Sequence, residues 1–180
     1  MKIEKKINST KGQVFVIDSN QFEVDRQLFK SKKEFQSQVI QLILSKLIGV
    51  HTLSHLENGA PYLKDSPYNI SISHCDNLFA IYISKVKVGI DIETIKKDIT
   101  KAKPFFINSL EQSTKWSFEE LYLIWCAKEA IYKSLDGTIK DLAKEVTINQ
   151  INEGRVYYKF DSKEDQLFYL KIDNWILAYT

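Results

Sequence analysis

The order of apolar and polar residues along the chain predicts two helices and a series of short strands. Residues 31–49 carry an apolar stripe at helical spacing, with Ser31 suited to the N-cap and Gly49 to the stop. Residues 118–135 predict a second long helix, which the Asp136-Gly137 pair ends. Segments rich in β-branched or alternating apolar residues predict strands at 13–18, 69–73, 78–85, 88–93, 145–149, 155–160, 166–172 and 175–179. A helix followed by strands therefore occurs once in each half.

Two stretches interrupt this pattern. Residues 58–67 contain an Asn-Gly pair and two prolines, and they predict a turn. Residues 94–117 are polar and rich in lysine apart from Phe105-Phe106-Ile107, and they predict a connection with short helical pieces. The whole pattern predicts an α+β fold of two similar lobes, residues 1–97 and 98–180.

Composition and charge narrow the class of protein. The chain has 180 residues, of which 44% are hydrophobic, as expected for a globular protein with a substantial core. Its longest apolar run, Leu78–Ile83, is far shorter than the roughly 18 residues that span a bilayer, so we expect no membrane contact. The first residues lack the apolar stretch of a secretory signal, so we expect a cytoplasmic protein.

Neither the cysteines nor the basic residues suggest a metal finger or a nucleic-acid partner. Cys75 and Cys126 have no neighbouring ligand at zinc-site spacing, which favours two reduced thiols. The net charge is only +2, and Arg26 and Arg155 are the only two arginines. Because arginine is the usual residue for reading bases, we expect no nucleic-acid binding.

The segment Gly89-Ile90-Asp91-Ile92-Glu93 is the first candidate for chemistry. Side chains alternate along a strand, so Asp91 and Glu93 face one side and the two isoleucines face the other. Neighbouring carboxylates repel unless a cation lies between them, and hard oxygen ligands suit Mg²⁺. The alternative is the solvated face of an amphipathic strand.

The second candidate lies on the predicted helix at residues 125–133. Lys128 falls within the apolar stripe, where a lysine must either reach solvent or pair with an anion. Glu129 and Lys133 are one helical turn apart at the edge of that stripe. The alternative for these two is an ordinary helix-surface ion pair.

The third candidate is the strand end Asn69-Ile70-Ser71-Ile72-Ser73-His74. Its hydroxyl, backbone N–H and imidazole groups are suited to holding a phosphate. A hydrolase dyad of Ser73 and His74 is disfavoured, because adjacent strand residues point to opposite faces. The alternative is a histidine with a purely structural role.

The three motifs, in this order, resemble those of the Sfp-type 4′-phosphopantetheinyl transferases. Residues 69–75, 89–93 and 125–133 are similar to the family patterns N-x-S-H-S, G-I-D-[IV]-E and W-[ST]-x-K-E-[AS]-x-x-K. Residues 58–62 resemble the family's G-K-P stretch, and residues 175–179 its last strand. The resemblance implies two lobes related by a pseudo-twofold axis, each a long helix on a small, mostly antiparallel sheet. It also implies an active site between the lobes.

The resemblance also implies roles for individual residues. It implies that Asp91, Glu93 and Glu129 bind Mg²⁺, and that Glu129, Lys133 and His74 are catalytic. Coenzyme A is then expected to contact Ser73, His74, Lys128, Lys133 and Pro61.

The sequence departs from the family pattern at several phosphate contacts. The lysine of G-K-P is Ala60 here, and the last serine of S-H-S is Cys75. Arginines that the family often carries on its first long helix are absent, and the nearest substitutes are Lys33, Ser37 and Lys46. The sequence alone therefore does not assign the contacts to the 3′-phosphate and adenosine.

The implied reaction is attack by a serine hydroxyl of an apo acyl or peptidyl carrier protein on the β-phosphate of coenzyme A. Phosphopantetheine moves to the serine and 3′,5′-ADP leaves. Glu129 is the expected acceptor of the serine proton, directly or through water. Two alternatives remain, a metal-dependent phosphoesterase and a catalytically inactive module that binds coenzyme A.

Two lobes in one chain lead us to expect a monomer. The lysine cluster and the resemblance together lead us to expect that the carrier protein docks near the connection after Glu93. Lys96, Lys97, Lys101 and Lys103 cluster there and suit an acidic partner. The candidate apolar anchors are Ile99, Phe105 and Phe106. The alternative is a solvated linker.

Overall fold

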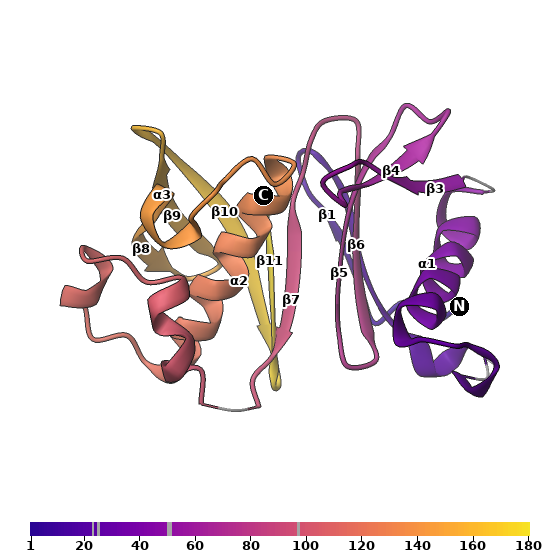
Figure 1. Ribbon diagram of the computed structural model, residues 1–180, viewed down its shortest axis with the longest axis horizontal. Coiled ribbons are helices and arrows are strands. Elements are labelled where there is room, and N and C mark those ends of the chain that lie inside the picture. The colour runs from indigo at the N-terminus through magenta and orange to yellow at the C-terminus, as the bar shows by residue number, and fades with distance from the viewer. Residues whose placement is uncertain (23, 25, 50–51, 97) are drawn as a thin grey trace.

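The computed structural model describes the whole chain except residues 23, 25, 50, 51 and 97 (Figure 1). Two antiparallel sheets lie side by side in the middle of the molecule, and a long helix covers the outer face of each (Figure 1). The helices are α1 (Lys32–Ile48) and α2 (Phe118–Ser134), with a short α3 (Leu142–Glu145). Turns of 3-10 helix occur at Ser19–Gln21, Arg26–Leu28, Thr100–Phe105 (η3) and Glu111–Ser113 (η4).

The first sheet has the strand order β1-β2-β6-β5, and the second has the order β7-β11-β10-β9-β8. The strands of the first sheet are β1 (Lys5–Asn8), β2 (Gly12–Asp18), β5 (Asn69–Cys75) and β6 (Leu78–Ser84). Those of the second are β7 (Ile90–Thr94), β8 (Val146–Asn152), β9 (Arg155–Phe160), β10 (Lys163–Ile172) and β11 (Trp175–Tyr179). A separate hairpin pairs β3 (Thr52–His55) with β4 (Pro61–Lys64).

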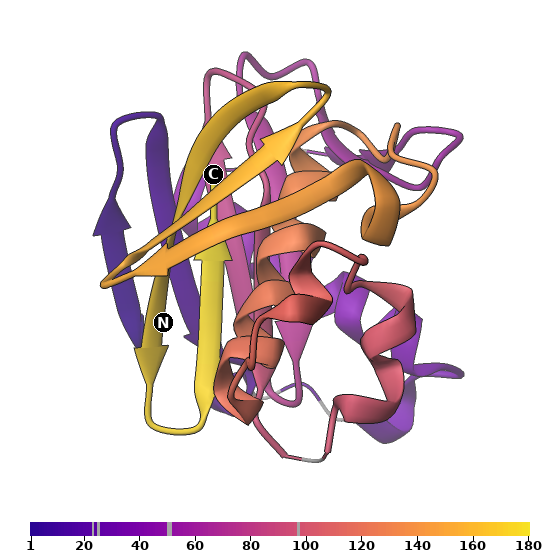
Figure 2. The same ribbon diagram turned by 90° about the vertical axis from the view of Figure 1, so that its left-hand side faces the viewer.

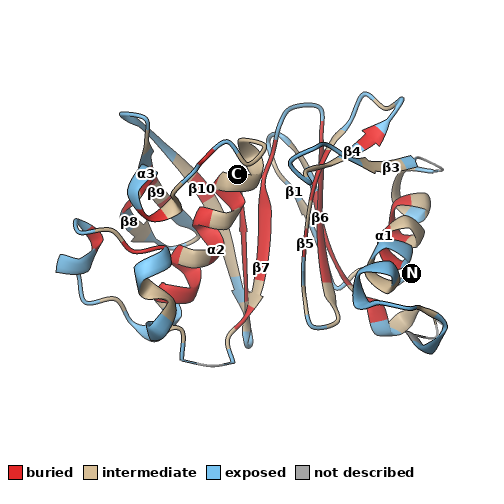
Figure 3. Cartoon of the chain, in the orientation of Figure 1, coloured by how far each residue is buried: buried red, intermediate tan, exposed pale blue. Residues whose placement is uncertain are grey.

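Three clusters of buried side chains hold these four layers together. One lies between α1 and the first sheet and contains Val39, Ile43 and Phe79. A second lies between the two sheets and contains Val16, Tyr82 and Ile90, while a third packs α2 against the second sheet. Figure 3 shows the most continuously buried strands in the middle of the molecule, and Figure 2 shows how the second sheet curves over α2. The core therefore extends across both sheets without a solvated gap between them.

Both long helices begin where their sequences predict. The Ser31 side chain accepts a hydrogen bond from Glu34 N at 3.1 Å, and Gly49 follows the last turn of α1 with a φ of 86°. Ser117 and Glu120 form a reciprocal capping box at the start of α2. Asp136 and Gly137, both with positive φ, follow its end.

The mixed helix and antiparallel-sheet architecture confirms the predicted α+β class. All eight predicted strands are present, and the connection after Glu93 contains the predicted short helical turns. The predicted turn at residues 58–67 is wrong in part, because it contains β4. Four short elements, β1, β3, β4 and α3, are missing from the prediction, because each has only four residues and too little alternation to be recognised.

The pseudo-twofold axis and the division after residue 97 stay predictions. The sheets themselves change between β6 and β7, since β7 pairs with β11 near the end of the chain. The C-terminal strand is therefore the neighbour that fixes the carboxylate-bearing strand in its sheet.

Gly89 fixes the distance between β7 and α2. A Cβ atom at this position would lie 1.8 Å from the Ala130 carbonyl oxygen and 2.7 Å from Ser134 N. Thr180 holds the same backbone from the other side, because its Oγ1 accepts from Gly89 N at 2.9 Å and its own N–H donates to Gly89 O at 3.0 Å. Only glycine allows this approach of strand and helix backbones.

We predict that Gly89→Ala destabilises the protein by about 3 kcal/mol or more, because the helix backbone has to move away from the new methyl group. Urea unfolding measures the loss. Gly154→Ala is the matched control, since Gly154 has a φ of 73° but its new methyl group would meet no atom within 4 Å. It should lose only the strain of the left-handed conformation, about 1–2 kcal/mol. Equal losses in the two variants would refute the packing role of Gly89.

Candidate functional site

Side chains of β5 join the two sheets along the free edge of β7. Ile90 N donates to Ser71 Oγ at 3.1 Å, and Thr94 N donates to Cys75 Sγ at 3.2 Å. Between them, Ser73 Oγ donates to Asp91 Oδ1 at 2.7 Å. Side chains at alternate positions of β5 thus form hydrogen bonds with groups along the unpaired edge of β7. We call the region where β5, β7 and the end of α2 meet the seam.

Asp91 is the most buried acid of the seam, with 4% of its surface exposed. Its Oδ1 atom accepts from Ser73 and also from Lys133 Nζ on α2, at 2.6 Å. Its Oδ2 atom is buried and has no hydrogen-bond partner among the described residues. Lys133 therefore pairs with a strand residue rather than forming the helix-surface pair with Glu129 that the sequence left open.

The two glutamates lie close enough to Asp91 to be affected by its charge. Glu93 Oε1 accepts from Trp125 Nε1 at 3.2 Å, and Cys75 Sγ lies 3.8 Å from Glu93 Oε2. Burial, and then the charge of Asp91, raise the pKa of Glu93. The same two causes, in the same order, raise the pKa of Glu129, and Lys133 opposes both shifts. The predicted metal ligands therefore share one electrostatic environment.

The donor chemistry of this environment fits a hard divalent cation. It offers three carboxylates, and one of their oxygens is buried without a hydrogen-bond partner among the described residues. Within the part of the chain that the structure describes, however, no three His, Cys, Asp or Glu side chains are close enough together to form a metal-binding group. Asp91 Oδ1 instead contacts the Lys133 ammonium.

His74 lies on the opposite face of β5 from Ser73, as strand alternation predicts. Its Nδ1 lies 3.3 Å from Gln36 Nε2 of α1, and its ring packs against Phe79. Burial, followed by the charges of Lys32 and Lys133, lowers the pKa of His74. The serine and histidine therefore do not form a hydrolase dyad, whereas cations from both long helices influence the histidine.

A cavity of about 550 Å³ adjoins the seam. It lies between the β3–β4 hairpin, β5 and the end of α2, and Lys133, Ser71 and Pro61 are among its lining residues. Asn58 of the hairpin donates to the Asp136 carbonyl, and Lys87 pairs with the Asp136 carboxylate at the same end. Ala60 also lines the cavity, so the family's missing lysine contributes no charge there.

Lys128, which the sequence predicts to contact coenzyme A, does not line the cavity. It is fully buried, and its Nζ donates to Phe106 O at 2.6 Å and to Glu111 Oε2 at 2.9 Å. Glu111 also accepts from Asn108 N and Ile148 N, so a single carboxylate connects α2, η4 and β8. Burial lowers the pKa of Lys128, and the Glu111 carboxylate opposes that shift. Lys128 therefore has the anionic partner that its place in the apolar stripe predicts, but this partner is Glu111 in the protein interior rather than a phosphate in the cavity.

Strand β7, helix α2 and the buried Lys128 lie in a part of the chain that matches a known family, whereas β5 and the β3–β4 hairpin lie outside that part. The sequence model of the 4′-phosphopantetheinyl transferase superfamily matches residues 87–180, which is more than half of the chain. The chain belongs to this superfamily. No curated protein matches the chain. Membership supports a phosphopantetheinyl transferase kind of function, with coenzyme A as the substrate that the superfamily generally uses. Among the described residues, no helix is both long and apolar enough to cross a membrane.

The structure brings together most of the residues that the sequence selects. Asp91, Glu93, Glu129 and Lys133 meet at the seam, and Ser73 bonds directly to Asp91. The sequence prediction omitted Ser71, Cys75 and Trp125, which contact β7, and Glu111, which pairs with Lys128. Trp125 and Cys75 lie within the motifs given above and could have been considered, whereas nothing around Glu111 indicates its partner 17 residues away.

We predict that Lys128→Met destabilises the protein by about 3–5 kcal/mol, because it leaves the Glu111 carboxylate buried without its cation. Adding Glu111→Gln should restore part of this stability, since the amide removes the unpaired charge. Urea unfolding of the two single variants and the double variant measures the coupling. A ligand role predicts the opposite pattern, with unchanged stability and weaker binding of coenzyme A.

Proposed function

We propose that this protein transfers the 4′-phosphopantetheine group of coenzyme A to a serine of an apo acyl or peptidyl carrier protein, with Mg²⁺ as cofactor. The observation that carries the proposal is the group formed by Asp91, Glu93, Glu129 and Lys133, of which Lys133 also lines the cavity. Superfamily membership supports the same chemistry. The three carboxylates would hold the Mg²⁺, which neutralises pyrophosphate charge when bound.

The cavity supports binding of coenzyme A between the β3–β4 hairpin and the end of α2. Pro61 of β4 and Lys133 of α2 both line it, which supports their proposed contacts to the coenzyme. His74 and Ser73 belong to the adjoining strand, but the Ser73 hydroxyl already donates to Asp91. Of the two, we therefore propose only His74 as a contact to the phosphates. Lys128 is not included in the proposed site, because its ammonium is already bonded to Phe106 and Glu111.

The residues of the chain have separate tasks in the reaction. The Lys133 ammonium supplies positive charge where negative charge develops on the phosphate oxygens of the leaving 3′,5′-ADP. Glu129 is the proposed acceptor of the serine proton, directly or through water. Ser73 and Trp125 hold the Asp91 and Glu93 carboxylates in place from either side. Positioning and charge neutralisation are most of what phosphoryl transfer requires.

The proposal is tested by incubating the protein with apo carrier protein, coenzyme A and Mg²⁺ and then weighing the carrier. A transferase adds one phosphopantetheine group to the carrier. A phosphoesterase would consume coenzyme A and leave the carrier unmodified, and an inactive binding module would change neither. Chelation by EDTA should stop the transfer, and added Mg²⁺ should restore it.

We predict that Asp91→Asn and Glu129→Gln each lower the transfer rate at least about a hundredfold, because each removes a charged ligand or base from the seam. Circular dichroism and urea unfolding provide the check on folding. Glu119→Gln is the matched control on α2, since Glu119 is largely exposed and pairs with Lys171. Near-normal transfer in either seam variant would contradict the assigned roles.

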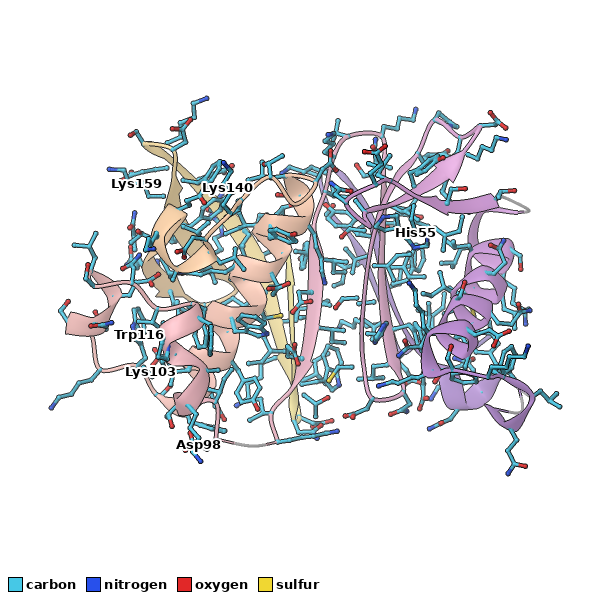
Figure 4. The ribbon with its side chains drawn as sticks, in the orientation of Figure 1. His55, Asp98, Lys103, Trp116, Lys140 and Lys159 are labelled. Carbon is cyan, nitrogen blue, oxygen red and sulfur yellow. The ribbon has the colours of Figure 1, made fainter. Side chains whose placement is uncertain are left out.

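We further propose that an acidic carrier protein docks at η3, the turn that contains Lys101, Lys103 and Phe105. Phe105 is 74% exposed, whereas Phe106 is fully buried, so the prediction of Phe106 as a surface anchor is wrong. Ile99 packs against the core cluster beneath α2. Lys96 pairs with Asp76 across the seam, and Lys97 lies outside the described residues. In Figure 4, Lys103 and Asp98 both lie in the lower left part of the molecule.

We predict that Lys101→Glu and Phe105→Ala each raise the Michaelis constant for the carrier severalfold and leave coenzyme A binding unchanged. A basic surface speeds encounter with an acidic partner, so Lys101→Glu should also weaken the salt dependence. Lys159→Glu makes the same charge change on β9, away from η3 in Figure 4, and serves as the control. An equal effect of Lys159→Glu would show that net charge, not η3, governs the encounter.

A further inference from the structure

Asp91, one of the three proposed metal ligands, is already paired with the Lys133 ammonium at the seam. Lys133 Nζ lies 2.6 Å from Asp91 Oδ1, and the two side chains are 26% and 5% exposed. We infer that Lys133 is the resident counter-ion of Asp91, and that phosphate entering the cavity draws it away so that Asp91 can take a divalent cation. This inference rests on the proposed function and adds an order of binding to it.

Asp91 needs a positive partner at all times because it is buried. An ionised carboxylate removed from water is costly unless a cation or several donors compensate it. Ser73 supplies one donor to Oδ1, and Oδ2 has none among the described residues. Glu93 and Glu129 add further negative charge nearby. Without a cation in this position, the three acids would repel one another and destabilise the seam.

Lys133 can supply that charge and can also leave. Its ammonium is carried on a flexible four-carbon chain, and the same residue lines the cavity beside Pro61 and Ser71. A change of side-chain rotamer would therefore exchange the carboxylate for a phosphate without moving α2. The partial exposure of Lys133, compared with the near-complete burial of Asp91, is consistent with a mobile cation on a fixed anion.

The pair would also oppose a divalent cation at these acids. Two cations at neighbouring oxygens of one carboxylate repel each other, so the resident ammonium weakens the binding of a divalent ion. Phosphate in the cavity would draw the ammonium away from Asp91 and so remove this repulsion. Metal and coenzyme A should then bind with positive coupling, and each should increase the affinity of the other by the same factor.

The test measures Mn²⁺ binding to the whole protein without coenzyme A, from the electron paramagnetic resonance signal of the free ion. Lys133→Met should bind Mn²⁺ at least about fivefold more tightly than wild type, although it transfers phosphopantetheine more slowly. Lys87→Met is the control, because it also removes a lysine that lines the cavity but one that pairs with Asp136. Its Mn²⁺ affinity should stay within about twofold of wild type.

A second variant, Lys133→Gln, keeps a hydrogen-bond donor near Asp91 without the charge, and it should also bind Mn²⁺ more tightly if Lys133→Met does not fold. Adding coenzyme A should tighten Mn²⁺ binding in wild type by at least about fivefold and by less in both variants. Unchanged or weaker Mn²⁺ binding in the variants overturns the inference. If the carrier is still modified by wild type, the proposed function stands without it. If the carrier is not modified but the variants bind Mn²⁺ more tightly, the function fails and the counter-ion role stands.

Discussion

The contact between β5 and the free edge of β7 is the constraint on which the site depends. Two sheets meet there without a ladder of backbone hydrogen bonds, and side chains at alternate positions of β5 make the connection. Ser71 and Cys75 satisfy backbone N–H groups of β7, while Ser73 bonds to a carboxylate. A change in the register of β5 by one residue would turn these three side chains to the α1 face and bring isoleucines to β7. The same contact thus holds the sheets together and fixes Asp91.

Burial at this contact stabilises the fold through its apolar side chains and at the same time disfavours the ionised form of the acids. Ile90 and Ile92 face the core between the sheets, so their strand cannot move outward without exposing them. Asp91 and Glu93 must then lie on the opposite side, against α2, where burial raises the pKa of Glu93. Gly89 makes the distance to α2 shorter than any other residue would allow. The buried isoleucines of β7 therefore keep Asp91 and Glu93 in a place where ionised carboxylates are disfavoured unless a cation is near.

The local features of this site could be predicted from the sequence, and the contacts across the fold could not. Strand alternation predicts that Asp91 and Glu93 share a face and that Ser73 and His74 do not, and both hold in the structure. Lys128 in an apolar stripe predicts a buried anion, but no local pattern selects Glu111 from the other acids. Likewise, Lys133 can pair with Glu129 on its own helix or with a strand residue 42 positions earlier, and only the packing of α2 on β7 selects Asp91.

The consecutive residues Lys128 and Glu129 show how one helix serves two regions of the protein. Successive residues on a helix point about 100° apart, so Glu129 reaches the seam while Lys128 enters the core beneath the second sheet. There Glu111 joins Lys128 to the backbone of Asn108 and Ile148, and Phe106 O accepts from the same ammonium. Phe106 directly follows η3, the proposed docking turn. The helix that carries the proposed base is therefore tied, through its neighbouring lysine and a buried ion pair, to the segment proposed to hold the carrier.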